Sequence, residues 1–293
     1  MSRSLLHGML WCCLLLLSGC GGSGSSTGLS VYITDAPIDS AIGANIGFTG
    51  VTVQGSGGVY AFQFSPVTPD LYQLQGGVEA FLIGDAQIPA GSYHAISLDM
   101  NAAPGTGASF LTLADGTLHQ IYIPTGEPTR ISVPIDFTLP TNGQVNITID
   151  FDLRKSIIQD PNDPTKFILR PVLRAVNNDD QGTISGIVSA SLISATTTCS
   201  PTVYVYRGDV TPTDVDVNAA PGTTQPVTSA LVGLNDTTGA FNFTAAFLPP
   251  GAYTVAFTCE ANLDFPDSAE NIAFTSIKHV TVSRNGNSVV TLD

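Results

Sequence analysis

Short runs in which apolar and polar residues alternate recur along most of this chain. Residues 29–34, 94–100 and 145–153 are three of them. Alternation with period two places apolar side chains on one face of a β-strand. Gly and Pro end the runs, and no segment of ten or more residues has a convincing helical period. The sequence therefore predicts an all-β protein with many tight turns.

A polar stretch without alternation, residues 177–182, divides the patterned sequence into two parts. Each part has the length of an ordinary domain. We expect two antiparallel β-sandwich domains in tandem, over residues 29–176 and 183–293, joined by a linker at 177–182.

Two local turn signals are strong. Ile88-Pro89-Ala90-Gly91-Ser92-Tyr93 and Leu248-Pro249-Pro250-Gly251-Ala252-Tyr253 share the pattern aliphatic, Pro, any, Gly, any, Tyr. At each we expect Pro to end a strand, Gly to take the sharp turn and Tyr to open the next strand, with its ring inward and its hydroxyl free to bond to backbone. Asn285-Gly286 lies between two alternating runs and predicts a two-residue type I′ hairpin.

The first twenty residues have the parts of an export signal. Arg3 precedes an apolar run at residues 9–17, which is too short to span a bilayer. The run ends in Leu17-Ser18-Gly19-Cys20, which resembles the bacterial lipobox. The resemblance implies that residues 1–19 are a signal peptide, and that Cys20 becomes the lipidated first residue, anchored in a membrane. The alternative is an ordinary cleaved signal with a coincidental cysteine.

Residues 20–28 are rich in Gly and Ser and predict a flexible tether between the lipid and the first domain. Gly21 is not Asp at the position after the lipidated cysteine. By resemblance to the enterobacterial sorting rule, this favours the outer membrane of the cell envelope over the inner one.

The net charge of −14 becomes −15 when Arg3 leaves with the signal peptide. Such an acidic chain repels polyanions, which excludes nucleic acid as a partner. Removal of Cys12 and Cys13 with the signal, and lipidation of Cys20, leave Cys199 and Cys259. In an exported protein this pair predicts one disulfide, which would stabilise the fold by roughly 4 kcal/mol in the chain-entropy model.

Both domains resemble known families. Thr34-Asp35-Ala36-Pro37, residues 70–74, 88–98 and 149–156, and the run 167–173 carry a resemblance to an uncharacterised domain of bacterial and archaeal lipoproteins, without an established activity. Residues 182–188, 238–243 and 247–255 are similar to the carboxypeptidase regulatory-like, transthyretin-type domain. That resemblance implies a Greek-key sandwich acting as an accessory module, whose related folds bind carbohydrate or proteins.

Signals for catalysis are weak. His94, His119 and His279 lie in or beside strand patterns, and nucleophile-elbow, zinc-protease and phosphate-loop motifs are absent from the sequence. We therefore expect a non-enzyme, with a divergent hydrolase as an alternative. A cluster of His, Asp and Ser within hydrogen-bonding reach would favour that alternative.

Acidic residues suggest calcium at one place. Asp214, Asp216 and Asn218 begin like a calcium loop, although Ala219 and Gln225 depart from the EF-hand pattern. Solubility alone also explains the acidity, and no other cofactor is expected. Asp150, Asp152 and Arg154 are predicted to form an ion-pair row on one strand face, and Asp35 could pair with an arginine there.

These features predict a lipid-anchored envelope protein that acts as a non-enzymatic binding or structural module. Its expected partners are the membrane, through the lipid, and envelope proteins or glycans. Glycan binding is the first alternative, because Tyr204 and Tyr206 share a strand face and could form a stacking platform; a buried sheet face is the more ordinary interpretation. The sequence does not indicate which ligand is bound.

Overall fold

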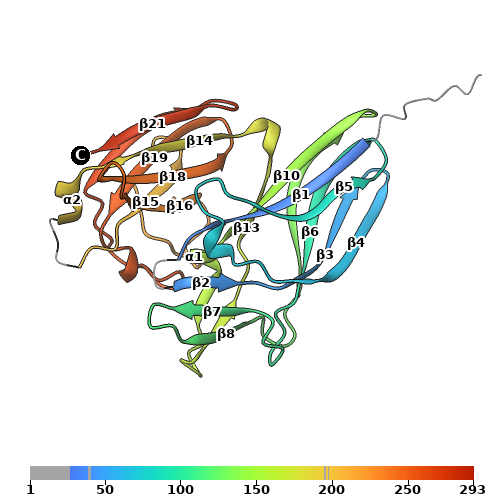
Figure 1. Ribbon diagram of the computed structural model, residues 1–293, viewed down its shortest axis with the longest axis horizontal. Helices are drawn as coiled ribbons and strands as arrows, with labels where there is room; N and C mark the ends of the chain where they lie inside the picture. Colours follow the sequence, from blue (N-terminus) through green and yellow to red (C-terminus); the bar gives the residue numbers. More distant parts are fainter. Residues whose placement is uncertain (1–26, 39–40, 195, 197) are drawn as a thin grey trace, which may run out of the picture.

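The structure, a computed structural model, describes residues 27–38, 41–194, 196 and 198–293. Within these ranges the regular structure is almost entirely β-strand, and the two α-helices are four and five residues long. The all-β prediction is confirmed. Figure 1 shows two β-domains side by side, with β1 in one and the C-terminus at the far end of the other. None of the described helices is long and apolar enough to cross a membrane.

The first domain contains two four-stranded sheets, of orders β13-β10-β1-β5 and β4-β3-β6-β9, and a five-stranded sheet of order β11-β12-β8-β7-β2 (Figure 1). Its elements are β1 Thr27–Ala36, β2 Ala41–Asn45, β3 Phe48–Gly55, β4 Gly58–Val67, η1 Leu71–Gln73, β5 Ala80–Gln87, β6 Gly91–Met100, β7 Phe110–Leu113, β8 Leu118–Tyr122, β9 Arg130–Leu139, β10 Gly143–Asp152, α1 Leu153–Ser156, β11 Ile157–Gln159, β12 Lys166–Leu169 and β13 Leu173–Asn177. The additional five-stranded sheet makes this domain more than the simple sandwich that was expected.

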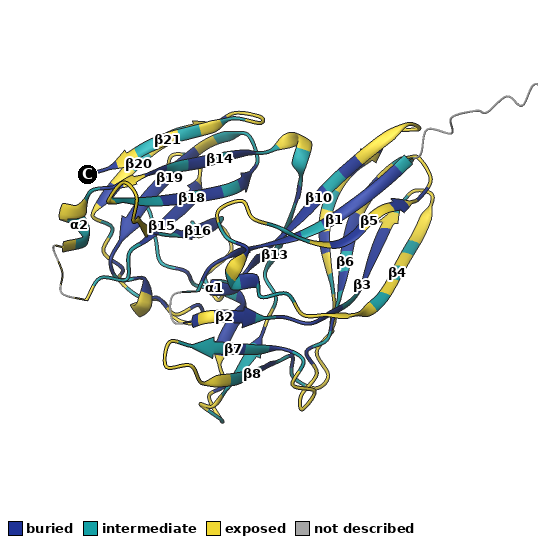
Figure 2. Ribbon diagram, in the orientation of Figure 1, coloured by how far each residue is buried: buried dark blue, intermediate teal, exposed yellow. Residues whose placement is uncertain are grey.

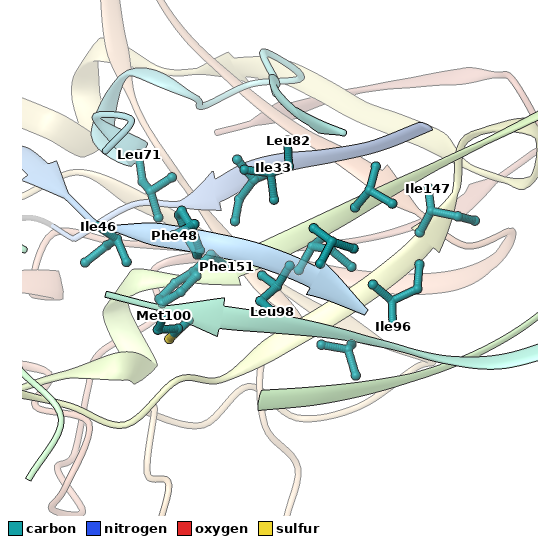
Figure 3. Packing of buried hydrophobic residues seen from close by; sticks show 14 of the residues in the cluster. Ile33, Ile46, Phe48, Leu71, Leu82, Ile96, Leu98, Met100, Ile147 and Phe151 are labelled. Carbon is teal, nitrogen blue, oxygen red and sulfur yellow. The ribbon is translucent and has the colours of Figure 1, made fainter. Parts of the chain in front are cut away.

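The core of the first domain is built from the inward face of each alternating strand. Figure 3 shows Phe48, Leu98 and Phe151 meeting from β3, β6 and β10, and none of the three has exposed surface. The rings of Phe48 and Phe151 meet edge to face with centroids 6.4 Å apart. Full burial of such a side chain contributes about 1.5–3 kcal/mol, so the period-two pattern directly supplies the driving force for this packing.

The second domain is a sandwich of two four-stranded sheets, of orders β17-β18-β14-β21 and β16-β15-β19-β20. Its elements are η2 Asn178–Asp180, which precedes it, β14 Gly182–Val188, α2 Ala190–Ser194, β15 Thr202–Arg207, β16 Thr228–Leu231, β17 Gly233–Asn235, β18 Ala240–Leu248, β19 Gly251–Thr258, η3 Ala261–Leu263, β20 Ser276–Val282 and β21 Asn287–Leu292. Buried residues line the facing strands, and both faces of β15 and β19 are largely buried (Figure 2). Cys199 and Cys259 form the predicted disulfide, with sulfur atoms 2.05 Å apart.

Three strand pairs are parallel: β1 with β10, β8 with β12, and β14 with β21. The sequence pattern predicted antiparallel sandwiches, because alternation identifies the buried face of a strand but not the direction of its neighbour. Each parallel pair joins strands that are far apart in the chain, which leaves the chain room to return to the same end of the sheet.

The predicted Asn285-Gly286 hairpin is wrong. The two flanking strands belong to different sheets, because β20 pairs with β19 and β21 pairs with β14. Asn285 has a positive φ of 54°, but its N–H donates to the carbonyl of Gln181 instead of closing a hairpin. The turn therefore carries the chain from one sheet to the other, since β14 offers an unpaired edge that the last strand completes.

The two tyrosine turns have the predicted structure. Tyr93 and Tyr253 are both buried, and the hydroxyl of each donates to the carbonyl of the proline four residues earlier, at 2.6 Å in both cases. Gly91 and Gly251 have φ angles of 155° and 151°, which favour glycine. The shared pattern thus encodes the same corner in both domains.

Candidate functional site

Three basic side chains of the first domain reach into the second: Arg154 and Lys155 from α1, and Arg174 from β13. Helix α1 begins where the side chain of Asp152 accepts a hydrogen bond from the Lys155 N–H at 3.1 Å, as an N-cap does. Strand β10 therefore ends at Asp152. The expected row of Asp150, Asp152 and Arg154 on one strand face is wrong, because Arg154 has left the strand.

Arg154 lies inside the second domain and is only 3% exposed. Its guanidinium carbon sits 5.2 Å from the centre of the Tyr204 ring, a cation–π contact. Its Nη1 donates to the carbonyl of Ala261 at 3.1 Å, and its Nε donates to the hydroxyl of Ser229 at 3.3 Å. One side chain of the first domain is therefore built into the interior of the second.

Lys155 makes a second link between the domains. Its Nζ lies 2.6 Å from an oxygen of Asp152 and donates to the carbonyl of Pro226 at 2.5 Å. The ammonium is thus neutralised by a carboxylate of its own domain while it bonds to the backbone of the other. Such charge-assisted hydrogen bonds are stronger than neutral ones.

Arg174 makes the third link in the same way. It pairs with Asp150 in its own domain and donates to the carbonyl of Phe247 in the second domain. Phe247 has a φ of 55°, unusual for a bulky residue, and lies at a register shift within the pairing of β14 with β18. A strained backbone conformation therefore coincides with a contact between the domains.

A cleft of about 430 Å³ lies beside these links, between the two domains. The first domain contributes the end of β1 and the loop 75–77, and the second contributes β16, β17 and β18. Its walls are mixed. Apolar side chains and glycines alternate with polar side chains, which include Gln75, Thr228, Ser229, Asn235, Asn242 and Thr244 and the carboxylates of Asp35 and Asp150. Gly76 and Gly77 have positive φ and lie close to Thr244 and Ala246, so the loop packs tightly on β18. The polar chemistry offered is hydrogen bonding by hydroxyl, amide and carboxylate groups.

Asp35 is buried at the edge of this cleft, at the end of β1. Its Oδ1 accepts a hydrogen bond from the Leu153 N–H at 3.4 Å, and its Oδ2 has no partner among the described residues. Burial, followed by the nearby charges of Asp150 and Asp152, raises the pKa of Asp35 well above its usual value. The sequence suggested that Asp35 could pair with an arginine, but this ion pair is not observed in the described part of the chain. The nearby basic residues pair with other carboxylates: Arg174 with Asp150, and Lys155 with Asp152.

The residues predicted to bind calcium are only partly brought together. Asp214 converges with Asp264 and Glu270, whose carboxylate oxygens lie within 4.8 Å of one another. Asp216 instead accepts the Asn218 N–H at 2.8 Å, and the Asn218 side chain donates to the carbonyl of Asp267. Asp264 and Glu270 are distant in sequence from the 214–218 run, so spacing could not identify them. A calcium site at Asp214 remains a prediction.

The carboxylates around Asp214 already accept protein hydrogen bonds. Asp264 accepts from the Tyr204 hydroxyl at 2.6 Å and from the Val215 N–H at 3.1 Å, and Asp214 accepts from the Glu270 N–H. Burial raises the pKa of Asp264 to about 6, against the lowering effect of Tyr204, Val215 and Arg154.

The tyrosine platform expected as one possibility is absent. Tyr204 and Tyr206 have no exposed surface, and they contact Phe274 edge to face at centroid distances of 5.5 and 6.3 Å. The ordinary interpretation, a buried sheet face, is correct here. These rings cannot stack on a sugar.

One histidine has a hydroxyl partner of the kind that a hydrolase would use. His119 Nε2 lies 2.8 Å from the Thr117 hydroxyl, which also lies 2.6 Å from Asp115, and His119 Nδ1 lies 2.9 Å from the carbonyl of Thr165. The single Thr117 proton serves either His119 or Asp115. Four cavities among the described residues are lined by other segments and not by this turn, whereas an active site needs a recess for substrate.

The remaining histidines give no better arrangement. His279 Nδ1 lies 3.1 Å from the Thr254 hydroxyl and 3.3 Å from Asp209, so both partners meet the same nitrogen. His94 is exposed on β6. The predicted lipidation residue, Cys20, and the predicted signal peptide lie outside the described residues.

Comparison with known proteins identifies the first domain. Residues 26–171 match a family model described as a domain of unknown function, DUF4382. The chain contains a DUF4382 domain. The match covers strand β1 with Asp35, strand β10 with Asp150, and helix α1. It ends two residues before β13 begins. No curated protein matches the sequence.

Solved structures give only distant likenesses. The Bacillus anthracis TIE protein is 14% identical, with 91% of this chain and 34% of that chain covered and a TM-score of 0.20; this chain thus spans about a third of its length. The minor pilin GBS52 of Streptococcus agalactiae is 10% identical, covering 89% and 93%, with a TM-score of 0.20. The fimbrial anchor protein Mfa2 of Porphyromonas gingivalis is 11% identical, covering 80% and 79%, with a TM-score of 0.18. Similarities at this level carry no argument about function, which is argued below from the chain's own residues.

Proposed function

We propose that this protein is a lipid-anchored protein of the bacterial cell envelope, held in the outer membrane through Cys20. It acts without catalysis as a binding or structural module that presents two β-domains as one body. The observation that carries the proposal is the docking of the domains by Arg154, Lys155 and Arg174, each of which donates to a backbone carbonyl of the second domain. Buried charged links of this kind favour one fixed arrangement.

The interdomain cleft is the proposed binding surface. Docking of the domains creates a recess in which hydroxyl, amide and carboxylate side chains lie among apolar ones, which suits a ligand that carries both hydroxyl groups and apolar surface. This favours a glycan as the second candidate function, although recognition would rest on hydrogen bonds and not on the stacking of aromatic rings. The accessory role implied by the resemblance of the second domain to the transthyretin type is consistent with such a module.

Two experiments test these proposals. Mass spectrometry of the mature protein should show an N-terminus at a modified Cys20, and an unmodified start elsewhere would end the lipid proposal. A pull-down from the envelope followed by a glycan array should identify a ligand. Binding should be lost in Asn242→Trp, which fills the cleft, and kept in Thr281→Trp, an equally bulky change on the exposed face of β20.

Equal binding by both tryptophan variants would exclude the cleft as the binding surface. Hydrolysis of any bound glycan would favour the alternative of a divergent hydrolase, and substitution of His119 would then show whether the Thr117 turn is responsible.

A further inference from the structure

Three chain connections and the start of β1 lie together at one end of the first domain. Thr27 pairs with Gly143, at the start of β10, and Gly28 pairs with Gln87, at the end of β5. On the facing sheet, Gly91 pairs with Leu139. The β3–β4 turn joins them through the Ser56 N–H, which donates to the carbonyl of Ser92 at 3.0 Å. We call this end the tip; it comprises residues 27–28, 54–60, 85–92 and 139–144.

The tip is poor in charge. Asp85 is its only charged residue, and its side chain accepts hydrogen bonds from Gln87 and Gln144. The rest of the surface is uncharged: glycine backbone, Ser and Asn, with Val59 63% exposed and Ala90 also exposed. At their opposite ends, strands β6, β9 and β10 carry Asp99, Arg130 and Asp152.

The tip is also where the chain enters the fold from the proposed anchor. Seven residue steps separate Cys20 from Thr27, which corresponds to a reach of at most about 25 Å when fully extended. Figure 1 shows β1 starting at the end of the first domain that lies away from the second domain. If Cys20 is lipidated, as proposed above, the tip must lie within that distance of the bilayer.

We infer that the tip is a membrane-facing surface whose partner is the lipid headgroup layer. The short tether selects this end, and the scarcity of acidic groups there lowers its repulsion from anionic lipids. Exposed Val59 and Ala90 can enter the interface, while hydroxyl and backbone groups bond to headgroups. The second domain and the interdomain cleft are then directed away from the bilayer.

Tryptophan fluorescence tests this orientation without background, because Trp11, the only tryptophan, belongs to the predicted signal peptide. The chain from Cys20 to Asp293 is coupled through Cys20 to a maleimide lipid in phosphatidylcholine–phosphatidylglycerol vesicles. Cys20 is its only thiol outside the Cys199–Cys259 disulfide. Val59→Trp and Ala90→Trp place a probe in two separate turns of the tip. Val289→Trp, at a 74% exposed position on β21 of the second domain, is the control.

Brominated lipids should quench both tip tryptophans and leave the control tryptophan unchanged. Equal emission with and without bromine at both tip positions, in variants with wild-type circular dichroism, would overturn the inference. Stronger quenching of Val289→Trp than of the tip probes would also overturn it, because the second domain would then face the bilayer.

Chemical coupling makes this result independent of natural lipidation. Mass spectrometry of Cys20 decides the proposed anchor, whereas quenching decides which surface faces the lipid. An unmodified native N-terminus together with quenched tip probes would defeat the proposed function while keeping the membrane-facing surface.

Discussion

Each domain contains a group of three carboxylates, and the two groups are neutralised by different means. The first acidic group consists of Asp35, Asp150 and Asp152, and the second of Asp214, Asp264 and Glu270. In the first group, Arg174 and Lys155 of the same domain neutralise two carboxylates. In the second, hydroxyl and backbone N–H donors surround the carboxylates, and the cation that influences Asp264 is Arg154 of the other domain.

The difference shows how buried charge organises the pairing of the domains. The cations of the first group neutralise their own carboxylates and then reach the backbone of the second domain. The negative charge of the second group is only partly neutralised within its own domain. The cation that lowers the pKa of Asp264 comes from the first domain. A buried carboxylate with a cation partner therefore stabilises docking, whereas one without a partner gains most from losing its charge.

The largest expected effect comes from removing a cation of the first group. Arg174→Met should destabilise the protein by about 3–5 kcal/mol, because Asp150 would stay buried without a counter-charge. Urea unfolding measures this loss. The matched control is Arg284→Met, which breaks the exposed Arg284–Asp180 pair and should change stability little. Similar losses in both variants would mean that Arg174 has no special role.

The unpartnered carboxylate should behave in the opposite way. Burial raises the pKa of Asp35, so the folded state holds its proton more tightly, and the free energy of unfolding falls as pH rises above the ordinary value of about 3.9. Asp35→Asn cannot ionise and should therefore be more stable than wild type at pH 7. A gain of about 1 kcal/mol corresponds to roughly 2–4 °C in Tm.

This advantage should shrink at pH values below the ordinary pKa of aspartate, where both proteins are uncharged at this position. Thermal unfolding at several pH values measures it, with Asp236→Asn, at an exposed turn, as the control. A destabilised Asp35→Asn at pH 7 would show that the charged carboxylate is needed.

The second acidic group should have a distinct pH dependence. Because burial raises the pKa of Asp264 to about 6, the folded state binds its proton more readily than the unfolded state between about pH 4 and pH 6. The contribution of Asp264 to stability therefore falls as pH rises through that window and is constant above it. Comparison of Tm from pH 4 to pH 7 should show a steeper decline in wild type than in Asp264→Asn. Parallel curves would contradict the shifted pKa.

Calcium should give the smallest effect and the sharpest contrast between the groups. If Asp214, Asp264 and Glu270 bind the ion, calcium at a concentration equal to Kd would stabilise the fold by about 0.4 kcal/mol. Asp214→Asn should abolish the rise in Tm, while Asp35→Asn should keep it. The absence of any shift in wild type at millimolar calcium would end the calcium prediction.

Prediction from sequence succeeded where a few neighbouring residues determine the outcome. The corners at Tyr93 and Tyr253 formed as expected, because Pro, Gly and Tyr at fixed spacing define the whole hydrogen-bonded turn. The Cys199–Cys259 pair was identified by elimination among the cysteines. The hairpin prediction at Asn285 failed. Asn285-Gly286 does form a turn, but these two residues could not specify that β21 would pair with β14 and not with β20.

The site was predicted least well because its parts come from distant segments. Arg154 was placed on a strand because its spacing continued that of Asp150 and Asp152, but the Asp152 side chain caps α1 and redirects the chain. Asp264 and Glu270 reach Asp214 only through folding of the second domain. No local sequence pattern near Asp214 indicates that Asp264 and Glu270 lie beside it.

The sequence by itself determined the all-β class, the division into two domains, the two tyrosine corners and the disulfide. Each follows from period-two burial, from turn chemistry or from a count of cysteines, all of which act over short distances or by exclusion. Only the tertiary structure decided the parallel pairings, the docking by Arg154, Lys155 and Arg174, and the position of the tip. These depend on which segments meet in space, and the free energy of such contacts arises only once both partners have been brought together.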